Sequence, residues 1–213
     1  LSRAFRLELG TGWNVPPGVL HAPGSLLTYE PQRASDAALF FQSQVEGRPA
    51  DLSALLKYVP PDRRGDYDFI LGVLDWEKNV DPHFREHYFL RPVPVAEEGL
   101  MAERGFRETW VVYGTDLFCA KELTVRPGRR VTITDGGSYG LIMIQGHGRL
   151  NQVPVETPAM IRFGQLTRDE MFVTEAAARQ GVVIENHSDC EDLVMLKHLG
   201  PDNPDAAGLI RRF

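Results

Sequence analysis

Cysteine, basic charge and long apolar runs are all scarce in this sequence. Its 213 residues include only two cysteines, Cys119 and Cys190, which are too few for a disulfide framework and favour a reducing, cytoplasmic setting. Lys and Arg total 23 against 29 Asp and Glu, so the net charge of −6 argues against a nucleic-acid partner. No apolar run approaches the roughly 18–20 residues that span a bilayer, which argues against a membrane partner.

Turn-forming residues, by contrast, are plentiful. There are 20 glycines and 15 prolines, a composition typical of many short elements joined by tight turns. A chain of this length can bury roughly 70% of its unfolded surface, so it needs neither disulfides nor a structural metal merely to fold.

The hydrophobic pattern divides the chain into four parts. Residues 1–50 carry strand-like runs at 5–9, 25–30 and 38–45, with Pro/Gly turns between them. Residues 51–107 contain helical spacing at 51–58 and 66–76, where Trp76 is expected in the core, and then a proline-rich linker over 79–98. Residues 201–213 are expected to form a loose tail.

The third part, residues 108–200, is expected to be a sandwich or barrel. Short strand signals recur there between Gly/Pro turns, together with one helical turn at 174–179. The expected strands are 109–113, 117–125, 130–134, 139–145, 160–163, 171–173, 182–186 and 193–199.

One segment carries a specific signature. Residues 10–21 fit the pattern G-x5-P-x-G-x2-H, with Gly10, Pro16, Gly18 and His21 at the four defined positions. Glycine and proline shape a tight turn, and the strand after it can present a histidine into a barrel. This pattern resembles the second motif of the cupin superfamily, small jelly-roll barrels that commonly hold a metal.

Within that superfamily, residues 10–58 are similar to type I mannose-6-phosphate isomerases. The likeness rests on His21 in its proline-containing turn, on Glu30, and on the Ser35-Asp36 pair. It implies a zinc-type divalent metal bound by Gln, His, Glu and His, of which His21 is the last. The other three ligands are expected before Leu1, and because the chain starts with Leu1 in mid-pattern, we expect it to be a piece of a longer one.

The same resemblance suggests roles for further residues. Glu30 and Asp36 are the candidate catalytic carboxylates, Arg33 is a candidate for contact with a substrate phosphate, and Arg48 is a candidate for both catalysis and that contact. One departure stands out: the position where the isomerases place an arginine near the substrate is Phe40 here. The metal would polarise a carbonyl while a protein base moves a proton between neighbouring carbons.

The third part lacks the metal ligands of a cupin. When the first cupin motif is aligned on Gly128, Thr134 and Gly136 occupy the histidine positions, and Gly140 or Leu141 the glutamate position. The second motif places Thr167 at its histidine position. This part is therefore expected to be a barrel without a metal, and a structural lobe or ligand pocket.

A zinc-protease string, H-x-x-E-H, also occurs at 83–87. It needs a long helix to place both histidines on one face, and prolines on both sides leave little room for one. A surface pair is the expected role of His83 and His87.

Together these observations predict an all-β double jelly roll, or bicupin, with a short helical insert and a first barrel that is incomplete in this chain. The favoured function is a metal-dependent isomerase acting on a sugar or sugar phosphate. The alternatives are a non-catalytic carbohydrate-binding or sensor cupin and an iron-dependent cupin oxygenase. Because a half-barrel leaves strand edges unpaired, upstream residues or a second copy in a homodimer are expected to cover them.

Overall fold

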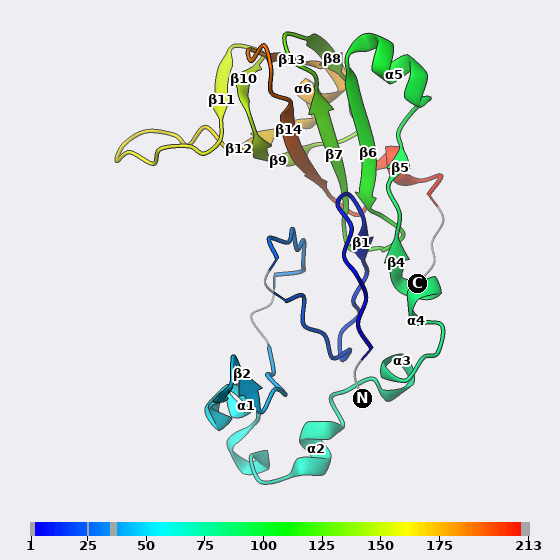
Figure 1. Cartoon of the computed structure of the whole chain (residues 1–213), viewed down its shortest axis with the longest axis vertical. Helices are drawn as coiled ribbons and strands as arrows, with labels where there is room; N and C mark the ends of the chain where they lie inside the picture. Colours follow the sequence, from blue (N-terminus) through cyan, green and yellow to red (C-terminus); the bar gives the residue numbers. More distant parts are fainter. Residues whose placement is uncertain (1–2, 25, 35–37, 210–213) are drawn as a thin grey trace. The chain divides into compact units, whose positions relative to one another are not determined.

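The computed structural model describes residues 3–24, 26–34 and 38–209. The chain divides into two compact units, Leu1–Asn14 with Tyr88–Phe213, and Val15–His87 (Figure 1). Among the described residues, every sheet of four or more strands lies in the first unit.

Eight strands of the first unit pair as four nested antiparallel hairpins. The pairs are β7 (Cys119–Val125) with β14 (Leu193–Leu199), β8 (Arg130–Ile133) with β13 (Val182–Asn186), β9 (Tyr139–Gln145) with β12 (Glu170–Val173), and β10 (His147–Leu150) with β11 (Val153–Glu156). Such nesting, in which the first strand pairs with the last, produces the two facing sheets of a jelly roll.

The two sheets have different widths. One has the order β12-β9-β14-β7 and continues through β6 (Phe106–Val112) to β5 (Val93–Pro94), and the other has the order β11-β10-β13-β8. Alternate side chains of both sheets point between them, and Leu123, Leu141 and Ile184 in this layer are at most 1% exposed. Each such side chain contributes about 1.5–3 kcal/mol when it leaves water.

Short elements complete this unit. They are β1 (Gly12–Trp13), paired with β4 (Phe89–Leu90), then α5 (Glu98–Arg104), α6 (Glu175–Gln180) and the 3-10 turn η2 (Pro204–Ala206). Helix α5 ends at Gly105, whose φ of 84° is the left-handed conformation that glycine adopts readily. Among the described residues no helix is long and apolar enough to cross a bilayer.

The second unit consists of short helices and turns. They are β2 (Gln44–Val45) paired with β3 (Arg48–Pro49), α1 (Leu52–Leu56), η1 (Pro61–Arg63), α2 (Tyr67–Leu71) and α3 (Trp76–Asn79), followed by α4 (Phe84–Tyr88) at its boundary. The Pro16-Pro17-Gly18 turn is held by α3, because Gly18 O accepts from Asp75 N at 3.1 Å and from Asn79 Nδ2 at 2.7 Å.

The strand predictions for the third part are mostly confirmed. Strands at 139–145, 182–186 and 193–199 have the expected bounds, and a helical turn follows Thr174, whose hydroxyl accepts from Ala177 N. The hairpin of β10 and β11 is not among the expected strands, because the glycines on both sides of His147 give this segment the composition of a turn. The expected strand at 160–163 is wrong, since this segment is an exposed loop.

The predictions for the first half need more correction. The expected strand at 5–9 is absent, and so is that at 25–30 over its described residues 26–30. Of the run 38–45, only Gln44 and Val45 form a strand. The helix expected over 66–76 ends at Gly72 and is followed by the separate α3, and Trp76 is 51% exposed rather than in the core. The described residues therefore contain one jelly roll, and a second barrel stays a prediction.

Close packing at Gly148 gives a direct test of the pairing of β10 with β13, which joins two of these hairpins in one sheet. A Cβ at this position would lie 1.9 Å from Glu185 O on the neighbouring strand. We expect Gly148→Ala to lower the free energy of unfolding in urea by at least about 1–3 kcal/mol, because the two backbones must separate. Gly208→Ala is the matched control, since no heavy atom lies within 4 Å of its Cβ; equal effects of the two substitutions would contradict the strand pairing.

Candidate functional site

The site residues predicted from the resemblance do not form a cluster. His21, Glu30, Arg33 and Arg48 are all exposed, and among the described residues no hydrogen bond or ion pair joins any two of them. Glu30 Oε1 accepts from Thr28 Oγ1 at 3.0 Å. Asp36 lies outside the described residues. Their roles stay predictions.

The turn that carries His21 differs from the expected one. Residues 19–24 are not a strand, so the imidazole is presented by a loop rather than by a barrel wall. His21 Nδ1 donates to Val19 O at 2.9 Å, because a carbonyl can only accept, and the lone pair of Nε2 is thereby left available.

The described residues do not form a zinc site. Such a site needs three or four converging donors, and no group of three His, Cys, Asp or Glu side chains is close enough in this part of the chain. His83 and His87 bind different carboxylates, Glu86 at 2.5 Å and Asp81 at 2.6 Å. Helix α4 has only five residues, which is too short for the zinc-protease arrangement. His83 and His87 are both exposed, as expected for a surface pair.

The residue aligned with the first histidine of the first cupin motif faces outward in the structure. Thr134 is exposed, whereas Val131, Ile133 and Asp135 are buried and follow the inward alternation of β8. A one-residue shift moves a side chain to the opposite face of a sheet, so the inward residue here is an aspartate and not the aligned threonine.

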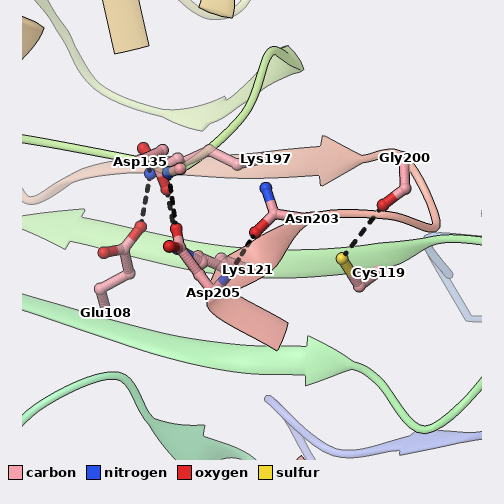
Figure 2. A network of polar contacts seen from close by, with 9 residues as sticks. Glu108, Cys119, Lys121, Asp135, Lys197, Gly200, Asn203 and Asp205 are labelled. Atoms are coloured by element: carbon pink, nitrogen blue, oxygen red, sulfur yellow. Dashed lines mark hydrogen bonds and ion pairs between the residues drawn. The ribbon is translucent and has the colours of Figure 1, made fainter. Parts of the chain in front are cut away.

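That aspartate belongs to a cluster of charges inside the jelly roll, which we call the interior ion-pair cluster. Its members are Glu108, Lys121, Asp135 and Lys197, all at most 3% exposed (Figure 2). Lys197 Nζ lies 2.6 Å from Glu108 Oε1 and 2.5 Å from Asp135 Oδ2. Lys121 Nζ lies 2.7 Å from Asp135 Oδ1, so the Asp135 carboxylate bridges the two ammonium groups.

Strand register brings these residues together from distant parts of the chain. Trp110 of β6 is opposite Lys121 of β7, which is opposite Lys197 of β14, so their side chains share the inward face. Two aromatic rings flank the ammonium groups: Lys121 Nζ is 4.5 Å from the centre of Trp110 and Lys197 Nζ is 4.7 Å from that of Tyr139.

The charges around Asp135 and Tyr139 shift the pKa values of these two side chains in opposite directions. Burial alone would raise the pKa of Asp135, but the charges of Lys197 and Lys121 and their hydrogen bonds outweigh it and lower that pKa. Burial, followed by the charges of Asp135 and Glu108, raises the pKa of Tyr139. The Tyr139 phenol therefore stays neutral while the Asp135 carboxylate stays ionised.

The sequence carried a signal for this cluster that its interpretation missed. Lys121 and Lys197 occupy inward positions of strands that are otherwise apolar, and the chain has only four lysines. A period-2 reading places both ammonium groups inside the sandwich. Their partners could not be identified this way, because Asp135 lies just beyond a predicted strand and pairing depends on the fold.

Outside the barrel, a groove of about 380 Å³ surrounds His198. It is lined by Leu141, Ile142, Thr167, Glu170, Met171, Phe172 and His198. Burial lowers the pKa of His198, with Glu170 opposing, and its Nδ1 is buried without a partner among the described residues.

The lowered pKa of His198 predicts a loss of stability in mild acid. The folded state disfavours the imidazolium, so the stabilisation is complete above the usual pKa of about 6.5 and declines as the pH falls below it. We expect His198→Gln to flatten the dependence of the unfolding free energy on pH between about 7.5 and 5.5. His147→Gln, at an exposed imidazole, is the matched control; an unchanged slope in the His198 variant would contradict the expectation.

No protein-family model matches the sequence, and the search of curated proteins found no match. Similar solved structures include a chain from the complex of Rhodobacter sphaeroides SigE with the anti-sigma ChrR, at 14% identity and a TM-score of 0.34, over 45% of this chain and 44% of that one. A cupin-2 domain from Rhodospirillum rubrum has 12% identity and a TM-score of 0.34, over 47% of this chain and 62% of its own. A cupin 2 domain-containing protein from Halorhodospira halophila has 19% identity and a TM-score of 0.35, over 53% and 78%.

Each likeness covers about half of this chain, and the first two cover less than two thirds of the matched protein. The class that the strand topology itself defines is a β jelly roll, here with a charged interior. The likeness to mannose-6-phosphate isomerase stays a prediction.

Proposed function

We propose that this chain is a binding module for a small polar molecule, which is the non-catalytic carbohydrate-binding or sensor class that the sequence offers as an alternative to the isomerase. The observation that carries the proposal is the interior ion-pair cluster. Replacing a buried ion pair by apolar side chains is often neutral or stabilising, so four buried charges are not explained by stability. Ammonium and carboxylate groups beside Trp110 and Tyr139 are the groups that hydrogen-bond hydroxyls and pack against a sugar face.

The test is ligand binding by the whole chain, without and with a metal chelator. A hexose, a hexose phosphate or a hexuronate is expected to raise the midpoint of thermal unfolding, because a ligand that binds only the folded state stabilises it. The shift should survive chelation and shrink in Glu108→Gln. No shift with any member of the three classes would contradict the proposal.

A second candidate is the metal-dependent isomerase of a sugar or sugar phosphate. The donation from His21 Nδ1 to Val19 O favours it, because metal-binding histidines usually donate their other N–H to a carbonyl or carboxylate. Its remaining ligands would have to come from the residues that the resemblance places before Leu1. Turnover of hexoses or hexose phosphates between aldose and ketose forms, with metal content lost in His21→Ala, would establish it over the binding module.

Three further predictions from the sequence do not distinguish these two candidate functions. Cytoplasmic location, a homodimer and a second barrel would suit either function.

A further inference from the structure

The interior ion-pair cluster is covered on one side by residues 200–209, which we call the C-terminal segment. Cys119 Sγ lies 3.6 Å from Gly200 O, and Asn203 Oδ1 accepts from Asp205 N at 2.9 Å (Figure 2). Ala206 and Leu209 pack against the core. The loose tail expected from the sequence is therefore wrong for the described part of this segment.

Asp205 is the residue of this segment that reaches the cluster. Its Oδ2 accepts from Gly136 N at 2.8 Å and lies 3.4 Å from Lys121 Nζ. The Asp205 side chain is 35% exposed, whereas that of Lys121 is 4% exposed, so the carboxylate lies between the buried cluster and solvent.

We propose that Asp205 occupies the position of a ligand carboxylate, and that the C-terminal segment is a displaceable plug over a carboxylate-binding site formed by Lys121 Nζ and Gly136 N–H. This inference rests on the proposed binding function and specifies its ligand as a small carboxylic acid, a sugar acid included.

The charges of the cluster suit an exchange of carboxylates. Lys121 and Lys197 balance Glu108 and Asp135, and Asp205 adds a third carboxylate that the folded chain tolerates. When Asp205 leaves, Lys121 retains only the carboxylate that Asp135 shares with Lys197. An incoming carboxylate restores the contacts that Asp205 made, at no change in charge.

An unpaired buried donor in the C-terminal segment favours its displacement. Asn203 is 8% exposed, yet its Nδ2 is buried without a hydrogen-bond partner among the described residues. A buried unsatisfied donor destabilises the closed state, and lifting the segment returns it to water. The C-terminal segment lies directly against the backbone at Gly136. Only a glycine permits this contact, because a Cβ on Gly136 would be 2.6 Å from Asp205 Oδ1 and from Pro204 Cγ.

The test is chemical rescue of Asp205→Ala by acetate. The substitution removes the carboxylate and keeps the main-chain N–H that binds Asn203, so Lys121 and Gly136 are left facing a vacancy. We expect acetate, at constant ionic strength against chloride, to shift the Gly136 amide resonance in this variant with an affinity at least about tenfold above wild type, where Asp205 competes. Asp205→Asn, which fills the position, and Asp202→Ala, at an exposed neighbour, should bind acetate no better than wild type.

Two outcomes would overturn the proposal. One is equal acetate binding by the alanine and asparagine variants, and the other is an Asp205→Ala chain that does not fold, which would make the segment a fixed part of the core. A hexuronate and glucose distinguish this inference from the proposed function. If acetate binds the alanine variant but neither the hexuronate nor glucose does, the carboxylate site is supported and carbohydrate binding is contradicted. If glucose binds wild type but acetate does not bind the alanine variant, carbohydrate binding is supported and the carboxylate site is contradicted.

Discussion

Replacing Lys197 by methionine is expected to lower the free energy of unfolding by about 3–5 kcal/mol. The Lys197 side chain is fully buried and its ammonium group contacts both Glu108 and Asp135, so its removal leaves Glu108 without a counter-charge in the interior. Urea unfolding followed by circular dichroism measures the change.

Two further variants make this result specific. Arg130→Met removes the exposed ion pair with Glu185, whose arginine is 69% exposed, and should change stability by less than about 1 kcal/mol. Adding Glu108→Gln to Lys197→Met removes the unpaired carboxylate and should recover part of the lost stability. The stability effects of substitutions at two contacting residues are not additive. Equal losses for Lys197→Met and Arg130→Met would show that the buried contacts are not formed.

Replacing Asp135 by asparagine should also cost about 3–5 kcal/mol at neutral pH, because two buried ammonium groups lose their shared carboxylate. The loss should depend on pH. The pKa of Asp135 is lowered in the folded state, so the stabilisation is complete above the usual pKa of about 3.9 and is lost as the pH falls through the lower folded value.

The difference between wild type and the Asp135→Asn chain is therefore expected to shrink in acid. Unfolding in urea at pH 7, 5 and 3 checks this, with Asp202→Asn as the control at an exposed carboxylate. A difference that stays constant down to pH 3 would contradict the assignment of the ionised carboxylate to Asp135.

Local patterns predicted the strands of the jelly roll well and the first half of the chain poorly. Strand 182–186 places the β-branched residues Val182 and Ile184 in inward positions, so its local preference and its burial agree. The run 26–30 has similar residues but no neighbouring strand among the described residues, and a strand is stable only when its backbone groups are paired. A pattern of four residues around His21 identified a turn, but it could not determine what the turn packs against.

The sequence by itself determined the mainly β character of residues 108–200, many of the turns that separate the strands and the net negative charge, because these follow from side-chain periodicity and composition. Only the tertiary structure decided that Glu108, Lys121, Asp135 and Lys197 meet, since they are separated by up to 89 residues along the chain. Nested pairing brings the first and last strands of the jelly roll side by side, and buried charges that meet there must satisfy one another because water cannot reach them.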